Sequence, residues 1–494
     1  MIIKLAEIQK LKIKKNNSLV IPFFSTGEIE VGNNQIATEI KKFSQYIKSI
    51  QEGEFRFFNF EKGEFIFLNL GDKKKWNQRK FFLTIRKIVR YLKENKIEKA
   101  VLLLDKIIPQ KSDISLISRQ VVENSLMADY EFNKYKSTPK NGWPKIKLIE
   151  IVWVDKRKYQ KEFLKGEMTG RIINFVRDIS NIPGGEMTPK KLAEISVSMV
   201  RKIKGIKTEV FDENKMKKLK MEGILGISQG SFQKPRLIIL KYFGNKNNKK
   251  IDLAFIGKGV TFDTGGLNIK PPDALMQEMY LDMSGGAAVL GAIMAIGKLK
   301  LPLNIISLIP AVENMPSDRA LRPGDIIKSY NGKTIEISHT DAEGRVIMAD
   351  ALAYAEKNFK PKMMVDIATL TGSAMAALGQ RAICLVTNSE KMENTFRQIG
   401  EESGDYAWPL PCWEEYEEDI KGTVGDISNS SKTKYGGAIT AAMFLKNFVD
   451  NIPWVHLDIA PTMTSIEGQG LSKGATGTGV RYLIRLAELF RKIK

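Results

Sequence analysis

The sequence predicts an α/β protein made of two domains. Apolar runs of strand length alternate with segments whose apolar residues recur at helical spacing, and this alternation continues along the chain. The length of 494 residues exceeds what one domain usually holds. The hydrophobic content of 43% is sufficient to fill sizeable cores.

The first domain is expected to span residues 1–160 and to form an open α/β sheet. Its buried strands are predicted at 17–24, 64–70, 100–105 and 148–154, and its helices at 78–94 and 113–135. The Pro-, Gly- and Asn-containing stretch 137–145 predicts a surface loop. We find neither a glycine-rich phosphate loop nor an acidic cluster in this sequence, so the domain carries no catalytic signal.

Residues 161–190 are expected to form a linker helix and the domain boundary. The charged segment 156–180 has helical character, and the Pro and Gly of 181–194 (NIPGGEMTPKKLAE) end it. Thr188 followed by Pro189 is a typical start for the next helix.

The second domain, 191–494, alternates in the same way and is expected to hold the chemistry. Its strands are predicted at 207–211, 235–242, 251–257, 303–309, 363–368, 382–387 and 454–458. Its helices are predicted at 284–298, 345–357, 437–450 and 476–492. Strand 251–257 delivers Lys258 at its carboxyl end and strand 363–368 delivers ATLTG, and ligand sites of α/β sheets gather at such ends.

The stretch from Gly257 to Arg345 concentrates ionisable residues among glycines, which let a ligand approach the backbone closely. It contains the blocks IGKGVTFDTGGLNIKP, YLDMSGGAAVL and SHTDAEGRVIMADAL. Its ionisable residues of interest are Lys258, Asp263, Lys270, Asp282, Asp341, Glu343 and Arg345. Neither a core strand nor a solvated helix needs this mixture, and we interpret it as a two-metal hydrolytic site.

Composition restricts the ligands of such a site. With 2 His and 2 Cys, the chain cannot assemble a His-rich or Cys-rich zinc centre, so oxygen ligands must dominate. The two cysteines suggest no disulfide framework, which favours a cytoplasmic setting. The N-terminal stretch lacks the apolar region of a signal peptide, and the longest apolar run, 285–297, is too short to span a bilayer. We therefore expect no membrane association.

The charges of the seven residues are informative. Asp341, Glu343 and Arg345 alternate with small residues, so an extended segment would point all three to one side. Two divalent cations neutralise the four carboxylates if Lys258 coordinates as a neutral amine. Lys270 and Arg345 then leave a positive surplus that favours an oxyanion. Every carboxylate is used for metal, so no obvious general base remains among the seven.

Two other functions remain open on these grounds. Carboxylates with Lys and Arg also suit phosphate, so another two-metal hydrolase such as a phosphoesterase is an alternative. The net charge of +21 suggests nucleic-acid binding or an architectural DNA role. However, the lysines are scattered, and we recognise no helix-turn-helix, zinc-finger or RNA-binding signature, so nucleic acid is not expected to be the main partner.

GKGVTFDTGGLNIKP and HTDAEGR closely resemble the signatures of the leucyl (cytosol) aminopeptidases, the M17 metallopeptidases, and weaker likenesses extend over nearly the whole chain. The resemblance implies a macro-like N-terminal α/β domain and a larger mixed α/β catalytic domain with a central sheet flanked by helices. It also implies hydrolysis of N-terminal residues from peptides with a free N-terminus, and a homohexamer.

The resemblance further implies a role for each site residue. A tighter metal would be bound by Lys258, Asp263, Asp282 and Glu343, and a looser, exchangeable metal by Asp263, Asp341 and Glu343 with the Asp341 carbonyl. The metals would be Zn or Mn, with Co or Mg possible in the exchangeable site. Lys270 would stabilise the developing oxyanion, and Arg345, helped by backbone near Leu370, would hold a bicarbonate that acts as general base.

The implied pocket for the N-terminal side chain is apolar and suits Leu or Met. It comprises Met279, Thr369, Leu370, Gly372, Ala460 and Met463. Two departures from the family pattern stand out. His339 occupies a position where the family usually has Asn, which bears on pH dependence. The interval from Lys270 to Asp282 is one residue longer than in better-known members, which bears on substrate preference.

Overall fold

The computed structural model describes residues 1–11, 17–26, 29, 31–60, 63–450 and 452–493. The chain forms two compact units. The first, the N-terminal unit, comprises Met1–Asn174 with Ile466–Lys473, and the second comprises Phe175–Ser465 with Gly474–Lys494. We call the second the catalytic unit because it contains the residues for which the sequence predicts the chemistry. The division falls within the long helix α5, Lys156–Ser180. The sequence had placed a helix over these same residues.

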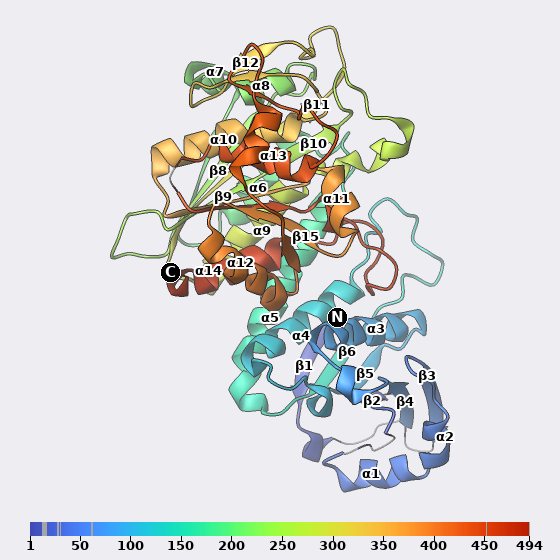
Figure 1. Cartoon of the computed structure of the whole chain (residues 1–494). Coiled ribbons are helices and arrows are strands. Elements are labelled where there is room, and N and C mark those ends of the chain that lie inside the picture. The colour runs from blue at the N-terminus through green and yellow to red at the C-terminus, as the bar shows by residue number, and fades with distance from the viewer. Residues whose placement is uncertain (12–16, 27–28, 30, 61–62, 451, 494) are drawn as a thin grey trace. The chain divides into compact units, whose positions relative to one another are not determined.

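The N-terminal unit is built on a six-stranded sheet with the order β1-β6-β5-β2-β4-β3 (Figure 1). Every neighbouring pair in it is parallel except β3 with β4. The strands are β1 Ile2–Ala6, β2 Ser18–Phe23, β3 Phe55–Phe60, β4 Gly63–Asn69, β5 Lys99–Leu103 and β6 Leu148–Val152. The helices are α1 Asn34–Lys41, α2 Ser44–Lys48, α3 Gln78–Glu94 and α4 Ile114–Asp129.

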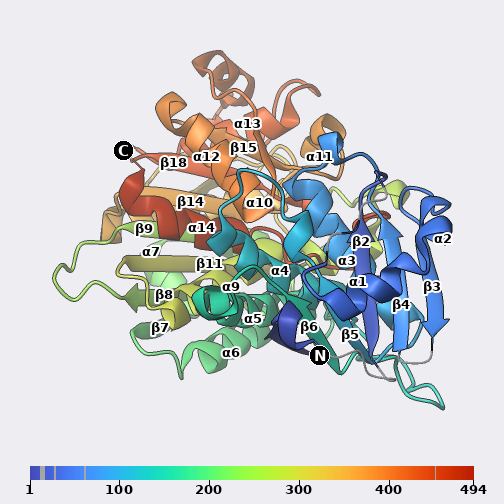
Figure 2. The ribbon, with the colours of Figure 1, turned by 90° about the horizontal axis from the view of Figure 1, so that it is seen from below.

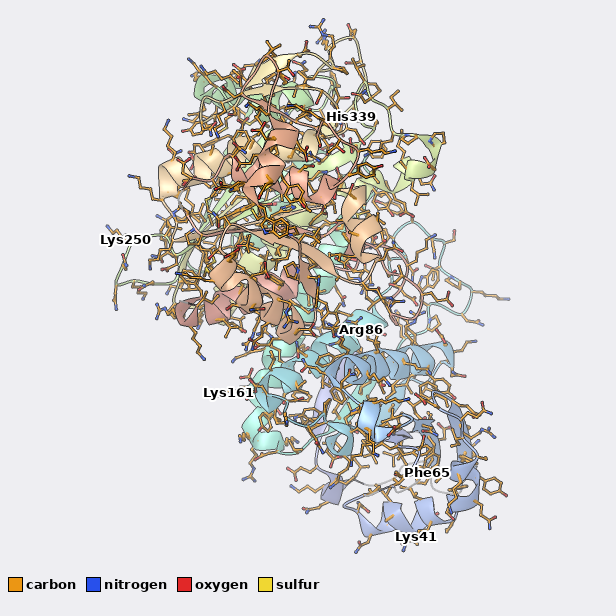
Figure 3. The ribbon with its side chains drawn as sticks, viewed as in Figure 1. Lys41, Phe65, Arg86, Lys161, Lys250 and His339 are labelled. Atoms are coloured by element: carbon orange, nitrogen blue, oxygen red, sulfur yellow. The ribbon has the colours of Figure 1, made fainter. Side chains whose placement is uncertain are left out.

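Each face of this sheet is covered by a different pair of helices. Val20, Ile66 and Leu102 pack with residues of α3 and α4. Alternate residues of the same strands, such as Ile21 and Phe65, pack with residues of α1 and α2, as expected because successive strand side chains point to opposite faces. Phe65 is fully buried, whereas the labelled Lys41 and Lys161 are exposed (Figure 3).

The catalytic unit contains a nine-stranded sheet whose continuous path is β16-β15-β18-β14-β9-β11-β8-β7, with β10 paired to β11. Its centre is parallel: β18, β14, β9 and β11 run in the same direction. The strands are β7 Ile206–Phe211, β8 Arg236–Phe243, β9 Leu253–Gly257, β10 Gly259–Asp263, β11 Asn304–Asn314, β14 Met363–Ala368, β15 Ile383–Thr387, β16 Ala407–Pro409 and β18 Trp454–Asp458. A small sheet joins β12 Ile326–Lys328, β13 Thr334–Glu336 and β17 Ile427–Ser428.

Helices cover both faces of the large sheet (Figure 2). Helices α8, α10 and α13 share one core with alternate residues of the central strands. Helix α9 contacts β9, β11 and β14, and α14 packs on α9. The helices of the unit are α6 Pro189–Val200, α7 Glu213–Leu219, α8 Glu222–Ser228, α9 Ser284–Leu299, α10 Glu343–Phe359, α11 Gly372–Leu378, α12 Glu390–Ser403, α13 Gly437–Lys446 and α14 Val480–Leu489.

The apolar helix Met276–Leu299 contains the longest apolar run of the sequence. It is long and apolar enough to cross a membrane, with a mean hydropathy of 1.5, but 89% of that window is buried inside the fold. Burial on all sides explains its composition, because a helix that is hydrophobic all round belongs in a core or a bilayer. It is the core helix of the catalytic unit.

The structure confirms the predicted α/β class and its alternation of elements, with several corrections. Strands β1, β3 and β10 and the short strands β12, β13, β16 and β17 were not predicted. The helix expected over 113–135 ends at Asp129, because Tyr130 adopts an extended backbone. The helix expected over 437–450 ends at Lys446. The helix expected over 476–492 begins only at Val480, since Gly477 and Gly479 have positive φ. Thr188 caps α6 as predicted, accepting a hydrogen bond from Lys191 N–H at 3.2 Å.

The buried face of β9 should be essential to the stability of the catalytic unit. Phe255 on β9 is fully buried, whereas Phe232 is 93% exposed. We expect Phe255→Ala to lower the free energy of unfolding by about 3–5 kcal/mol, because the deletion removes buried area and leaves a cavity. Urea unfolding followed by circular dichroism measures the change. Phe232→Ala is the matched control, and a similar loss in both variants would contradict the assigned core.

Candidate two-metal site

The predicted site residues converge at the carboxyl edge of the central parallel strands. Lys258 directly follows β9, and Asp263 ends β10. Asp282 lies in the 3-10 helix Met276–Met283, which leads directly into α9. Glu343 is the first residue of α10. Since the carboxyl ends of parallel strands meet at one edge of a sheet, segments far apart in the sequence place their side chains together there.

Glycines allow the backbones around this edge to approach closely. A Cβ on Gly285 of α9 would lie 2.2 Å from the Ile367 carbonyl oxygen on β14, and one on Gly257 would lie 2.6 Å from the Gly285 carbonyl oxygen. A Cβ on Gly344 would lie 2.6 Å from Cε of Lys258. Such distances are shorter than real contacts. At Gly285 and Gly257 the neighbour is backbone, so only glycine fits, whereas at Gly344 the end of the Lys258 side chain would have to move.

Lys258 connects two of the carboxylates. Its Nζ lies 2.8 Å from Asp282 Oδ1 and 2.7 Å from Glu343 Oε1, and it donates to the Thr369 carbonyl at 3.0 Å. The side chain is 4% exposed. Burial by itself lowers the pKa of Lys258, but the carboxylates of Asp282, Glu343 and Asp263 outweigh it and raise the pKa above its ordinary value.

Lys270 connects the other two carboxylates from the loop after β10. Its Nζ lies 2.7 Å from Asp263 Oδ2 and 2.6 Å from Asp341 Oδ1. Burial lowers its pKa as well, and Asp263, Glu343 and Asp341 more than reverse that effect. Burial, followed by the neighbouring Asp263 and Glu343, raises the pKa of Asp341 to about 7. The site therefore concentrates negative charge that its lysines balance only in part.

The arrangement fits metal binding. Oxygen atoms of Asp263, Asp341 and Glu343 lie within 4.8 Å of one another. Three buried oxygens, Asp282 Oδ2, Asp341 Oδ1 and Glu343 Oε1, have no hydrogen-bond partner among the described residues, although the last two are in ion-pair contact with lysines. Four carboxylates against two lysines leave two negative charges. Hard divalent cations prefer such oxygen donors, so these residues suit them.

Residues 341–345 are not extended, so the one-sided arrangement considered for an extended segment does not occur. Residues 340 and 341 form a turn, and α10 begins at Glu343. An acidic residue is favoured in the first turn of a helix by the helix dipole, and the apolar pattern that follows Arg345 continues the helix. Asp341 and Glu343 still lie close together. The turn at 340–341 and the start of α10, not a strand, bring their side chains to the same place.

Arg345 is buried on the first turn of α10 and is 9% exposed. Its Nη1 donates to the Asn429 carbonyl at 3.0 Å, while its Nε is buried and has no hydrogen-bond partner in the part of the chain that the structure describes. Burial lowers the pKa of Arg345 to about 10, although the nearby carboxylates of Glu343, Asp458 and Asp341 oppose this shift. A buried guanidinium with an unused donor is suited to an anion.

The residues assigned to the side-chain pocket lie on three neighbouring segments. Thr369 and Leu370 follow β14, and Gly372 begins α11. Ala460 begins the 3-10 helix Ala460–Thr462, which contacts α11, and Met463 follows it. Met279 lies in the 3-10 helix that carries Asp282. Thr369 directly contacts the charged cluster, because its Oγ1 donates to Asp282 Oδ1 at 2.7 Å.

Sequence reasoning missed the polar residues that hold this edge together. Asn314 ends β11, and its Nδ2 donates to Asp263 Oδ1 at 2.9 Å and to the Thr340 carbonyl at 3.1 Å. Asp458 ends β18 and is 1% exposed. Its carboxylate accepts from the N–H groups of Leu370 (3.0 Å) and Ala460 (3.1 Å) and from Thr371 Oγ1 (2.8 Å). In the sequence, the only indication of Asn314 and Asp458 is that each is a polar residue at the end of an apolar strand.

The two histidines differ in their surroundings. His339, labelled in Figure 3, is exposed and lies beside the site. Its Nδ1 accepts from Asp341 N–H at 3.3 Å, and burial, followed by Arg345 and Lys270, lowers its pKa. His456 is fully buried inside the sheet, with Nδ1 2.5 Å from Asp366 Oδ1. Its position inside the sheet indicates a structural role.

An α/β fold with this carboxylate cluster is suited to a hydrolase that binds metal ions. Comparisons with known proteins specify the family. The catalytic-domain model of the cytosol aminopeptidase family matches residues 174–484, and the model of that family's N-terminal domain matches residues 53–139. The chain belongs to the cytosol aminopeptidase family and is therefore a metallo-aminopeptidase, as the sequence motifs had indicated.

Individual relatives and structures agree. The probable cytosol aminopeptidase of Clostridium perfringens (strain 13 / Type A) is 36% identical over 498 residues, covering 97% of this chain and 98% of that protein. That of Solibacter usitatus (strain Ellin6076) is 42% identical over 401 residues, covering 81% of each. The solved structure of the bottromycin maturation enzyme BotP has a TM-score of 0.82 at 28% identity, over 96% of this chain and 99% of that one. The same enzyme in complex with Mn also has a TM-score of 0.82, at 27% identity.

Gly344 should be required for the position of Lys258. We expect Gly344→Ala to displace the Lys258 side chain and to lower kcat/KM by about tenfold to a hundredfold, as small misplacements of catalytic groups do. Stability should change less than activity, because the preference for Ala over Gly within a helix, about 1 kcal/mol, opposes the cost of moving Lys258. Peptide-amide hydrolysis and thermal unfolding measure the two effects. Gly185→Ala, where a Cβ meets open space, is the control. Unchanged activity in Gly344→Ala would contradict the close contact.

Asp458 should act as a positioning residue for the loops after β14 and β18. Asp458→Ala removes all three acceptor contacts, and we expect KM to rise and kcat to fall, each by about tenfold. Asp458→Asn keeps one oxygen for the two N–H groups and offers an amide to Thr371 Oγ1, so most activity should return. Steady-state kinetics on both variants decide the point. Equal losses in the two would contradict positioning through these hydrogen bonds.

Proposed function

We propose that this metallo-aminopeptidase removes N-terminal residues with Leu-like or Met-like side chains from peptides, using two metal ions and a bound bicarbonate. The observation that carries the proposal is the convergence of Lys258, Lys270 and the four carboxylates at one edge of the sheet, in ion-pair contacts of 2.6–2.8 Å. Two pairs of carboxylates, each bridged by a lysine, suit two adjacent cations rather than one.

The proposed ligands are those that the resemblance to the family implies, and the closeness of Asp263, Asp341 and Glu343 supports them. Lys258, Asp263, Asp282 and Glu343 would hold the tighter ion, and Asp263, Asp341 and Glu343, with the Asp341 carbonyl, the exchangeable one. Zn and Mn are the proposed ions, and Co and Mg also suit the exchangeable site. When bound, such ions would polarise the scissile carbonyl, lower the pKa of water and bind the free α-amino group. The exposed fractions of two side chains support one exchangeable and one tighter site. The Asp341 side chain is 27% exposed, whereas the Asp282 side chain is 6% exposed.

The residues of the chain contribute the remaining chemistry. Lys270 is 12% exposed at its side chain and lies at the open side of the cluster, where its ammonium would stabilise the oxyanion that develops on the substrate. Arg345 would hold bicarbonate through its free Nε, and the anion would take a proton as general base. The backbone N–H of Leu370 already donates to Asp458. Arg345 is therefore proposed as the main hydrogen-bond donor to the bicarbonate.

The proposed side-chain pocket involves Met279, Thr369, Gly372, Ala460 and Met463. Space above Gly372 supports it, because a Cβ there would meet no atom within 4 Å. Met279 and Met463 are only partly buried, so both can contact a ligand, and flexible methionines adapt to apolar side chains. An acidic side chain would lose its hydration in such surroundings without gaining a partner, which explains the proposed preference.

We also propose a homohexamer in the cytoplasm. Relatives named for the cytosol support the location. Large exposed hydrophobic residues on the catalytic unit, including Phe232, Val424 and Tyr435, support association of copies. The proposed substrate, a peptide with a free N-terminus, does not depend on whether the protein is a hexamer.

Substrate assays test the proposed function directly. We expect the enzyme, loaded in turn with Zn, Mn, Co or Mg, to release Leu and Met from amino-acid amides and Glu poorly, and chelation to abolish this activity. N-acetyl-leucine amide is the matched control, because it lacks the free amino group. Hydrolysis of a phosphate ester in preference to the amides, or full activity in a verified metal-free preparation, would contradict the proposal.

The two cations beside the reacting carbonyl should differ in their effects. Lys270→Ala should lower kcat by about two or three orders of magnitude with a smaller change in KM, because it removes stabilisation of the transition state. Added bicarbonate should raise the wild-type rate from a depleted buffer, and Arg345→Ala should lose this response, which is worth about 10²–10⁴-fold for a general base.

The measurement is rate against bicarbonate concentration at fixed pH and ionic strength for the wild type and Arg345→Ala. Metal content measured in parallel shows whether the ions stay bound. If both proteins respond to bicarbonate in parallel, Arg345 does not hold the base.

A further inference from the structure

The catalytic unit contains an open groove of about 470 Å³ that the proposed peptidase chemistry does not use. Three parts of the chain line it: the loop between α5 and α6, the loop between α8 and β8, and the ends of β10 and β11. A volume of this size is typical of a site for a small molecule. The side chains that give the groove its chemistry are Phe232, Phe262 and Glu313.

The groove is separate from the carboxylate cluster, although the same two strands contribute to both. In the pairing of β10 with β11, Phe262 lies opposite Glu313 and Asp263 lies opposite Asn314. Successive side chains on a strand point to opposite sides. Since Asn314 donates to Asp263 within the cluster, Phe262 and Glu313 point away from it. A ligand in the groove therefore does not compete with the metal ligands for space.

Glu313 brings a negative charge into the groove without a cation beside it. The residue is 9% exposed, and its Oε2 accepts a hydrogen bond from Ser231 Oγ at 2.6 Å. Among the described residues it forms no ion pair, and Lys234 of the neighbouring loop contacts Glu213 Oε2 instead, at 3.3 Å. Burial raises the pKa of Glu313, while the hydrogen bond from Ser231 opposes that shift. A bound cation would stabilise this carboxylate.

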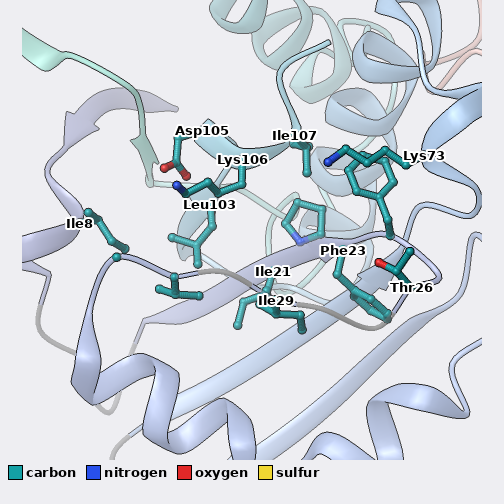
Figure 4. Close-up of a pocket in the computed structure, with 14 residues that line it drawn as sticks. Ile8, Ile21, Phe23, Thr26, Ile29, Lys73, Leu103, Asp105, Lys106 and Ile107 are labelled. Atoms are coloured by element: carbon teal, nitrogen blue, oxygen red, sulfur yellow. The ribbon is translucent and has the colours of Figure 1, made fainter. Parts of the chain in front are cut away.

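The rest of the lining is aromatic or open rather than basic. Phe232 is 93% exposed, and Phe262 is half-buried. A Cβ on Gly185 would meet no atom within 4 Å, so the groove is open at that point. In contrast to the cavity of the N-terminal unit, which Lys73 and Lys106 line (Figure 4), the groove has neither lysine nor arginine among its described lining residues. This composition favours a cation over an anion.

We propose that this groove binds a quaternary ammonium compound, a class that includes choline. The trimethylammonium group would contact the carboxylate of Glu313 and the rings of Phe232 and Phe262, because aromatic faces attract such cations. A quaternary nitrogen carries no N–H, so it requires only a negative charge and aromatic or apolar surface. A primary ammonium group has three donors to satisfy and is more strongly hydrated, so it gains less in these surroundings.

Calorimetric titration of choline into the full-length protein tests the proposal. We expect a dissociation constant of about 10⁻³ M, and binding at least about tenfold weaker for the neutral isostere 3,3-dimethylbutanol and for the primary amine ethanolamine at the same ionic strength. Glu313→Gln should also bind choline at least about tenfold more weakly. This variant should fold, because it removes the charge but keeps an oxygen that can accept from Ser231. Glu194→Gln is the matched control, since this exposed carboxylate of α6 does not line the groove.

Two variants of Phe232 test the aromatic contribution. Phe232→Ala should weaken choline binding by about twofold to fivefold, whereas Phe232→Trp should bind at least as tightly as the wild type, because Trp attracts cations most strongly. Gel filtration of both variants shows whether their oligomeric state is unchanged, as we expect.

Four results would overturn the proposal. They are no binding at about 10 mM choline, equal affinity in Glu313→Gln and Glu194→Gln, an isostere or ethanolamine that binds as tightly as choline, and a loss of affinity in Phe232→Ala that accompanies a change of oligomeric state. The last result would identify the groove as a contact between copies of the chain.

Discussion

The catalytic unit depends on holding four carboxylates together in a mostly buried space. Like charges so close would repel strongly in a low-dielectric interior, and desolvation would add to the cost. Lys258 and Lys270 offset this repulsion, each contacting two carboxylates at 2.6–2.8 Å. Because the carboxylates come from β10, α10, the turn before α10 and the 3-10 helix before α9, the cluster fixes where these elements meet. The remaining negative charge is what makes divalent cations the natural ligands.

The surroundings of the cluster are built to prevent movement. Glycines let α9 and α10 begin in direct contact with strand backbone and with the Lys258 side chain. Apolar residues of the central strands fill both faces of the sheet behind the cluster. Asn314 and Asp458, at the ends of β11 and β18, connect the loops that carry the charged residues and the proposed pocket. Rigid strands, close backbone contacts and hydrogen-bonded loops together keep side chains from distant parts of the sequence within bonding distance.

Much of this could be predicted from the sequence, because local signals were strong. The segment 156–180 and the central strands had clear periodicity, and the glycine-rich blocks identified the charged residues. The turn at Asp341 was misjudged, since a period-two pattern over three residues is too short to distinguish a strand from a helix start. Strand β10 was missed because Lys258 and two glycines interrupt its apolar run. Asn314 and Asp458 could not be recognised, since their roles exist only in contacts between distant segments.

We propose that two unequal metal sites share Asp263 and Glu343, with Asp282 serving one and Asp341 the other. Metal content after gel filtration, measured by elemental mass spectrometry for wild type, Asp282→Ala and Asp341→Ala, tests it most directly. Asp273→Ala, an exposed carboxylate of the nearby loop, is the control and should bind metal like the wild type. The account predicts that Asp282→Ala loses tightly held metal, whereas Asp341→Ala keeps that ion and loses only the exchangeable one. Equal loss of metal in these two variants would contradict it.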